Sequence, residues 1–145
     1  MVITYSIILL GLLALFRPLQ RNRFYILHAA LVIGAAYYIE THWFRASVFG
    51  SKTLLLFIVF QLVSINIVTF IAYGVDKRAA VKGAWRIPEA DLHALEFLGG
   101  WSGALVAQKF FKHKTKKKSF RTDFYLVILA ELVVIGLILH FLGFF

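Results

Sequence analysis

The chain has 145 residues, of which 61% are hydrophobic, and its mean hydropathy is +0.80. Soluble domains contain roughly 45–50% apolar residues, so we expect one unit that uses a bilayer to cover its apolar surface. The absence of cysteine excludes disulfides, thiolate metal sites and cysteine nucleophiles. In a membrane protein the net charge of +9 is first a signal for the orientation of the chain in the bilayer, and second a signal for an anionic ligand.

Four segments are apolar enough to cross a bilayer, and the predicted spans are residues 1–16, 24–44, 53–75 and 124–142. The first is short against the roughly 20 residues of a typical span, and a cleaved signal peptide is its rival interpretation. It lacks a basic start and a small-x-small cleavage site, which favours a retained helix. The sequence therefore predicts an all-α membrane protein with four transmembrane helices.

The long connection, residues 76–123, contains two short helical stretches. Pro88 precedes acidic residues that suit the first turn of a helix, and Gly99-Gly100 stops or bends that helix. Residues 102–111 then resume an apolar helix. Each half has roughly ten residues, too few to span. We expect a re-entrant or interfacial hairpin between the third and fourth spans, and one bent fifth span over 92–111 is the alternative.

Basic residues are distributed unevenly among the connections. The first contains three, the second two and the long connection eleven. In a four-span arrangement the first and third connections share a side, so fourteen basic residues oppose two. The positive-inside rule then places both connections in the cytoplasm and both termini outside. With five spans the sums are seven inside and nine outside, which favours the four-span arrangement with a cytoplasmic-side hairpin.

Polar residues occur within the predicted spans, where ionisable groups by default mark function. At 1.5 Å per residue, Glu131 lies about 10 Å from the cytoplasmic end of its span, Thr69 and Asn66 lie about 9 and 14 Å deep, and His28 lies about one turn in. They predict a polar cavity open to the cytoplasm, and interhelical packing is the alternative. One helical face carries Asn66, Thr69, Tyr73 and Lys77.

Three residues of the long connection are candidate acids or bases, namely Asp76, Glu89 and His113. Asp76 could tie the loop down through a salt bridge, coordinate a cation or act as a base. The residues Glu89, His93 and Glu96 share one face of the predicted helix. This pattern can bind a metal or form an acid/base pair, and a solvated face is the alternative, so no metal site is predicted.

Basic side chains and glycine amides are the candidate ligand-binding groups: Lys77, Arg86, Gly99, Gly100, Gly103, Lys114, Thr115 and Lys117. Lysine and arginine bind phosphate, and glycines can expose N–H groups to an anion at the start of a helix. Tight packing of the hairpin is the alternative for the glycines. No P-loop, GxSxG, HExxH or dinucleotide fingerprint is present.

Residues 76–121 resemble a bacterial family described as a membrane domain of unknown function, which follows a cold-shock-type domain in some members. The matching pieces are Asp76-Lys77 with Ala80, Arg86 with Pro88-Glu89, Leu92-His93, Gly99-Gly100 with Gly103-Ala104, and His113-Lys114-Thr115 with Lys117 and Phe120. The family often has a proline inside the glycine motif, where this chain has Ser102. The resemblance implies a multi-pass protein of the bacterial inner membrane and no established activity. A cold-shock domain is not found in this sequence.

The first functional hypothesis is a basic cytoplasmic site for a phosphate-bearing amphiphile, an anionic phospholipid or a polyprenyl phosphate. The sequence leaves open whether the protein also acts on this lipid as an enzyme, and it names no cofactor. A nucleic-acid tether is a second hypothesis, in which Phe110, Phe111 and Phe120 stack bases beside the lysines. A transporter or channel component using Glu131 is a third, and four short spans would then need a homo-oligomer. For the basic connection itself, we expect its separated pieces to converge at the membrane surface.

Overall fold

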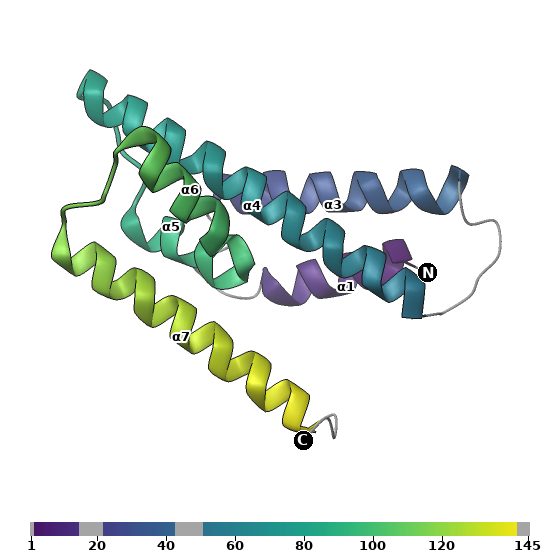
Figure 1. Ribbon diagram of the computed structural model, residues 1–145. Coiled ribbons are helices and arrows are strands. Elements are labelled where there is room, and N and C mark those ends of the chain that lie inside the picture. The colour runs from purple at the N-terminus through teal and green to yellow at the C-terminus, as the bar shows by residue number, and fades with distance from the viewer. Residues whose placement is uncertain (1, 15–21, 43–50, 142–145) are drawn as a thin grey trace.

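The computed structural model describes residues 2–14, 22–42 and 51–141, and the regular structure in these residues is helical (Figure 1). The elements are α1 (Val2–Leu13), α3 (Arg23–His42), α4 (Ser51–Lys82), α5 (Glu89–Leu95), the π-helical turn η1 (Glu96–Gly100), α6 (Trp101–Phe111) and α7 (Lys118–Phe141). The predicted all-α class is therefore confirmed. Of the predicted spans, residues 1, 15, 16, 43, 44 and 142 lie outside the described residues.

Two helices extend beyond the spans predicted for them. Helix α4 runs seven residues past Val75 and ends at Lys82, where Gly83 takes a left-handed φ of 65° and Ala84 N–H donates to the Ala79 carbonyl at 3.0 Å. This is the hydrogen bond of a Schellman cap. Helix α7 begins at Lys118 rather than residue 124, since polarity alone does not break a helix.

Helices α5 and α6 fold back on each other against α4 (Figure 1). Helix α5 starts beside Asp76, which accepts a hydrogen bond from Ile87 N–H, and ends where Glu96 meets Tyr73. Helix α6 then runs the other way along α4. The residue Gly103 contacts Asn66 near the start of α6, and Phe111 contacts Gly74 at its end. Residues 89–111 thus begin and end at the same end of α4 and form a helical hairpin.

The turn of this hairpin is where the two glycines predict a bend. Gly99 adopts a φ of 95° inside η1, a conformation that residues with a Cβ rarely take. The helix before it starts after Pro88, as predicted. A π-helical turn of this kind often marks a functional segment, and here it forms the apex of the hairpin.

The start of α3 lies at the same end of the bundle as the start of α5 (Figure 1). The buried Asn22 caps α3, because its Oδ1 accepts the N–H groups of Phe24 and Tyr25. Its Nδ2 donates to the Asp91 carbonyl at 3.0 Å. This hydrogen bond joins the start of α3 to α5.

The main core lies between α4, the hairpin and the first turns of α7. Its fully buried side chains include Ile65, Tyr73, Leu92, Leu95 and Phe120. Beyond this core, α7 diverges from the other helices (Figure 1), and its apolar residues Leu132, Val133, Val134, Ile135 and Leu137 are exposed. In the described residues, two helices, Arg23–His42 and Phe57–Lys82, are long and apolar enough to cross a membrane.

Candidate functional site

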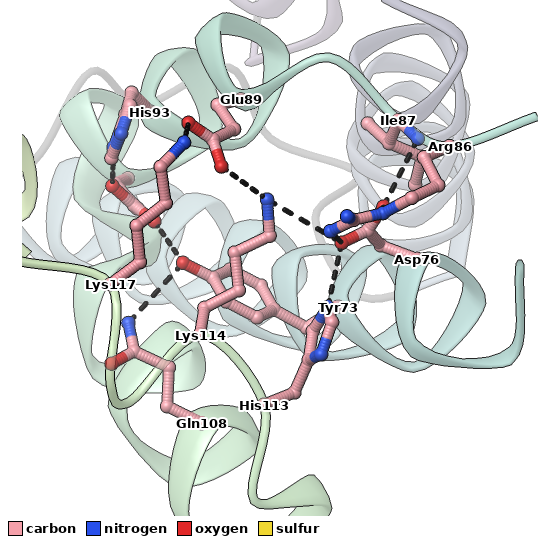
Figure 2. Close-up of polar contacts among 11 residues, drawn as sticks. Tyr73, Asp76, Arg86, Ile87, Glu89, His93, Gln108, His113, Lys114 and Lys117 are labelled. Atoms are coloured by element: carbon pink, nitrogen blue, oxygen red, sulfur yellow. Dashed lines mark hydrogen bonds and ion pairs between the residues drawn. The ribbon is translucent and has the colours of Figure 1, made fainter. Parts of the chain in front are cut away.

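Asp76 is the centre of a polar cluster at the end of α4 (Figure 2). Its carboxylate is fully buried and accepts Ile87 N–H at 3.1 Å, Arg86 Nε and Nη2 at 3.4 and 3.2 Å, and His113 Nε2 at 2.7 Å. These donors come from the segment before α5 and from the turn after α6. The side chain of Asp76 therefore fastens both ends of the hairpin to α4.

Lys114 connects Asp76 to a second carboxylate, that of Glu89. Its Nζ lies 3.6 Å from Asp76 Oδ2 and 3.0 Å from Glu89 Oε1, and the side chain is only 4% exposed. Lys117 Nζ completes the cluster 2.7 Å from Glu89 Oε2. The Lys114 ammonium also lies 4.7 Å from the centre of the Phe120 ring, within the range of a cation–π contact.

The turn that carries these residues has an unusual backbone. Lys112 and Lys114 have φ values of 46° and 59°, in the left-handed region that non-glycine residues rarely adopt. Such conformations cost about 1–3 kcal/mol each and persist where the surroundings determine them. The ion pairs of Lys114 and the hydrogen bond between His113 and Asp76 supply those surroundings.

The ion pairs shift the pKa values of their members. The ammonium groups of Lys117 and Lys114 lower the pKa of the Glu89 carboxyl, because their hydrogen bonds favour its charged form. The carboxylate of Asp76 raises the pKa of the Arg86 guanidinium for the same reason. Both groups are therefore charged at neutral pH. Arg86 and Lys117 are also open to solvent, with side chains 49% and 57% exposed.

The structure thus brings together most of the predicted polar residues of the connection: Asp76, Arg86, Glu89, His113, Lys114 and Lys117. Two of the candidates do not join this cluster. Thr115 is exposed and Lys77 is partly buried, and neither has an interaction with the cluster among the contacts of the described residues.

A solvated face for His93 and Glu96 is the wrong interpretation of the helical spacing. Glu96 is fully buried, because it lies where α5 turns inward, and His93 Nδ1 donates to its Oε2 at 2.6 Å. Tyr73 donates to the other oxygen, and Gln108 Nε2 donates to the Tyr73 hydroxyl at 3.3 Å. Sequence reasoning missed Gln108 and the role of Tyr73. A carboxylate inside the apolar run LEFLGG was the signal that could have revealed a buried network.

The glycines pack the hairpin against α4. A Cβ at Gly103 would lie 2.3 Å from the Asn66 carbonyl oxygen, and a Cβ at Gly100 would lie 2.2 Å from Thr69 Oγ1. The Gly103 N–H, expected to face an anion, donates instead to Asn66 Oδ1 at 2.6 Å, and Asn66 Nδ2 donates to the Gly99 carbonyl. Asn66 thus occupies the start of α6, where the anion was expected.

The other polar candidates of the predicted spans also lie at helix contacts. Thr69 donates to the Ile65 carbonyl within α4. His28 Nδ1 lies 3.0 Å from Ser64 Oγ, between α3 and α4. Glu131 reaches from α7 toward the apex of the hairpin, where its Oε1 lies 3.6 Å from a Cβ built on Gly99 and its Oε2 is buried with no hydrogen-bond partner.

Comparison with known proteins identifies the part of the chain that carries the cluster. Residues 66–120 match the family described as "Protein of unknown function (DUF1294)". The chain is 36% identical over 76 residues to the uncharacterized protein YsdA of Bacillus subtilis (strain 168), which corresponds to 52% of this chain and 85% of that protein. No solved structure matches the chain. The matched region runs from Asn66 to Phe120, and the chain belongs to the DUF1294 family.

Proposed function

We propose that the protein is a multi-pass membrane protein in which α1, α3, α4 and α7 cross the bilayer. The support is the outward face of these helices, which is apolar along most of its length. Exposed examples are Ile8 on α1, Leu31 on α3, Ile67 on α4 and Leu129 on α7. A water-exposed surface of this composition is unfavourable, whereas lipid chains match it.

The same arrangement makes α5, η1 and α6 a re-entrant hairpin. Asn66, which contacts its apex, lies ten positions before Asp76 on α4, or about 15 Å along the helix. This is about half of a hydrocarbon core of about 30 Å. With Asp76 at the membrane surface, the apex at Gly99 lies near the middle of the bilayer.

The distribution of charge sets the orientation. All the lysines and arginines whose side chains the structure describes belong to the start of α3, the end of α4, the segment before α5, the end of α6, or the turn and first residues of α7. Figure 1 places these segments at one end of the bundle. By the positive-inside rule this end faces the cytoplasm of a bacterial inner membrane, and both termini lie outside.

We propose that this basic end binds lipids with anionic phosphate head groups. The observation that carries the proposal is that the cations fall into two groups, one buried in ion pairs and one exposed to solvent. Lys114 is buried against Asp76 and Glu89, whereas a second set is exposed and has no ion pair with a described acid: Arg78, Lys82, Lys109, Lys112, Lys116, Lys118 and Arg121. Basic residues at a membrane surface attract anionic lipid by about 1 kcal/mol each.

The geometry supports binding more than acid/base catalysis by Asp76 and His113. These two groups are hydrogen-bonded to each other, and Asp76 has three further donors around it. Its carboxylate is therefore occupied by the fold. Arg86 and Lys117 retain solvent-exposed donors that a phosphate can reach.

Binding of single-stranded nucleic acid has less support. It requires aromatic faces beside the cations, but Phe120 is fully buried and Phe111 packs against Gly74. Phe110 alone of the three is exposed.

A proton or ion path through Glu131 is a second candidate function, favoured by its buried, unpartnered Oε2 at the hairpin apex. Its test is ion flux in proteoliposomes, which E131Q should abolish.

Quenching of Trp85 tests the lipid proposal. This residue is exposed and adjoins Arg86, so it reports on lipids at the basic end. In a W43F/W101F variant, Trp85 is the only tryptophan. Brominated phosphatidylglycerol should quench its fluorescence at lower mole fractions than brominated phosphatidylcholine. Equal quenching by the two lipids would contradict the proposal, and retention of a labelled single-stranded RNA by the same sample would support the tether instead.

A further inference from the structure

A second polar network lies beside the Asp76–Glu89 cluster and shares none of its hydrogen bonds (Figure 2). Its hydrogen bonds run from Gln108 to the Tyr73 hydroxyl, from that hydroxyl to Glu96, and from His93 Nδ1 to the other oxygen of Glu96. Tyr73 and Glu96 are completely buried. All three bonds are directed toward the Glu96 carboxylate, which fixes the orientation of the His93 ring.

The charge of Glu96 has to be balanced inside the protein. No lysine or arginine of the described residues forms an ion pair with it, and its partners are the neutral Tyr73 hydroxyl and the His93 ring. A buried carboxylate without a cation is costly. Of these two partners only the His93 ring has a cationic form, the imidazolium, which carries an N–H on Nε2 as well as on Nδ1.

An N–H on Nε2 would have no acceptor among the described residues. The Nε2 atom of His93 is buried and has no hydrogen-bond partner there, and a buried donor without an acceptor is destabilising. Its neighbours indicate which acceptor fits. The His93 ring lies 4.5 Å from the ring of Phe120, over which Lys114 Nζ also lies. Glu89, one helical turn away on α5, holds Lys117.

We propose that His93 Nε2 donates to an anionic phosphoryl oxygen as the innermost contact of the phosphate site. Lys117 is the outer contact, because its half-exposed ammonium can exchange Glu89 for the ligand. Glu96 and Tyr73 act as positioning residues that hold the His93 ring. This inference rests on the proposed lipid function and names the atom that would recognise its phosphate.

Nitrogen-15 NMR of the histidines tests this inference without relying on a loss of function. The ¹⁵N-histidine-labelled protein is placed in phosphatidylcholine nanodiscs, in the same nanodiscs containing phosphatidic acid, and in phosphatidylcholine nanodiscs with inorganic phosphate added. The signal that disappears in H93Q identifies His93. We expect phosphatidic acid to change the chemical shift of Nε2. The chemical shift of Nδ1 should remain that of a nitrogen hydrogen-bonded to a carboxylate.

The arms separate the two proposals and the two sources of phosphate. A shift with inorganic phosphate alone would support His93 as a hydrogen-bond donor to phosphate. It would assign the site to free phosphate rather than to lipid. If mass spectrometry of the sample shows bound phosphatidic acid but Nε2 is unchanged, the His93 inference is wrong and lipid binding stands. If neither phosphatidic acid nor inorganic phosphate binds, both proposals fail.

Two variants measure the contribution of the network. E96Q replaces the carboxylate that accepts from His93 Nδ1 and orients the ring, so phosphatidic acid should bind at least tenfold more weakly. T41A is the control, because Thr41 is exposed near the end of α3 and lies outside both the network and the basic set. Unchanged affinity in an E96Q protein whose histidine spectrum is otherwise native would overturn the inference.

Discussion

The Nε2 atom of His113 lies 2.7 Å from Oδ2 of Asp76, although 37 positions separate the two residues in the chain. This contact joins the turn after α6 to the end of α4. Together with the hydrogen bonds from Arg86 and Ile87 to the same carboxylate, it holds the two ends of the hairpin against the end of α4. The ion pairs of the basic connection are therefore part of the fold as well as of its surface.

Replacement of Asp76 by asparagine should destabilise the protein strongly. The amide NH2 of the asparagine would face donors on Arg86, His113 and Ile87. The substitution would also remove the negative charge that balances Lys114. Breaking a buried ion pair costs about 3–5 kcal/mol, so the midpoint of thermal unfolding in detergent should fall well below that of the wild type. K116Q changes an exposed residue and should leave the midpoint unchanged, and a D76N midpoint equal to that of K116Q would refute the structural role.

The pairing of Glu89 with Lys117 and Lys114 should make stability depend on acid pH. Because the folded protein lowers the pKa of Glu89, its ion pairs contribute fully above the unfolded pKa of about 4.3. They are lost as pH falls through the lower, folded pKa. Glu89 is partly exposed, so the effect should be below about 1 kcal/mol.

The measurement for this prediction is a set of thermal unfolding midpoints between pH 7 and pH 3 for the wild type and E89Q. The difference between the two proteins should be constant at neutral pH and shrink toward the acid end. A difference that grows on acidification has the wrong sign for this pairing.

Close packing at Gly103 should make it intolerant of a side chain. In G103A the added Cβ would meet the backbone carbonyl of Asn66 at 2.3 Å, and backbone on both sides leaves little room for relaxation. Overpacking of this kind costs about 1–3 kcal/mol. The matched control is G34A on α3, where nothing lies within 4 Å of the new Cβ. Equal unfolding midpoints for G103A and G34A would show that the hairpin does not pack in this way.

Single cysteines can report the sidedness of the membrane, because the chain has none of its own. S119C, at the exposed start of α7, and T41C, at the exposed end of α3, should lie on opposite sides. In intact cells an impermeant maleimide should label T41C and reach S119C only after permeabilisation. Labelling of both in intact cells would contradict the four-span arrangement.

The sequence predicts much of the architecture because apolar length and glycine position act locally. The hairpin with its bend at Gly99 follows from Pro88, the short helical stretches and the glycine pair. The ends of α4 and α7 do not follow, since hydropathy marks where a span would leave lipid and not where the helix stops. For α4 that point is Gly83.

The candidate site divides in the same way. The convergence of Asp76, Glu89 and His113 could be expected from the signature that contains them. The acceptor for the N–H groups at the start of α6 could not be predicted. An asparagine on another helix and an external anion satisfy these N–H groups equally well. Burial of Glu96 likewise depends on the angle at which the hairpin enters the bundle, which only tertiary packing determines.

Native mass spectrometry of the protein purified from bacterial membranes in mild detergent tests the central claim most directly. The wild type should retain anionic phospholipid in preference to zwitterionic phospholipid. A K112Q/K116Q/K118Q/R121Q variant should lose most of that lipid while unfolding at the same temperature, since these side chains are exposed and lie outside the Asp76–Glu89 cluster. A wild-type protein that retains no anionic lipid, or a variant that retains as much of it, would contradict the account.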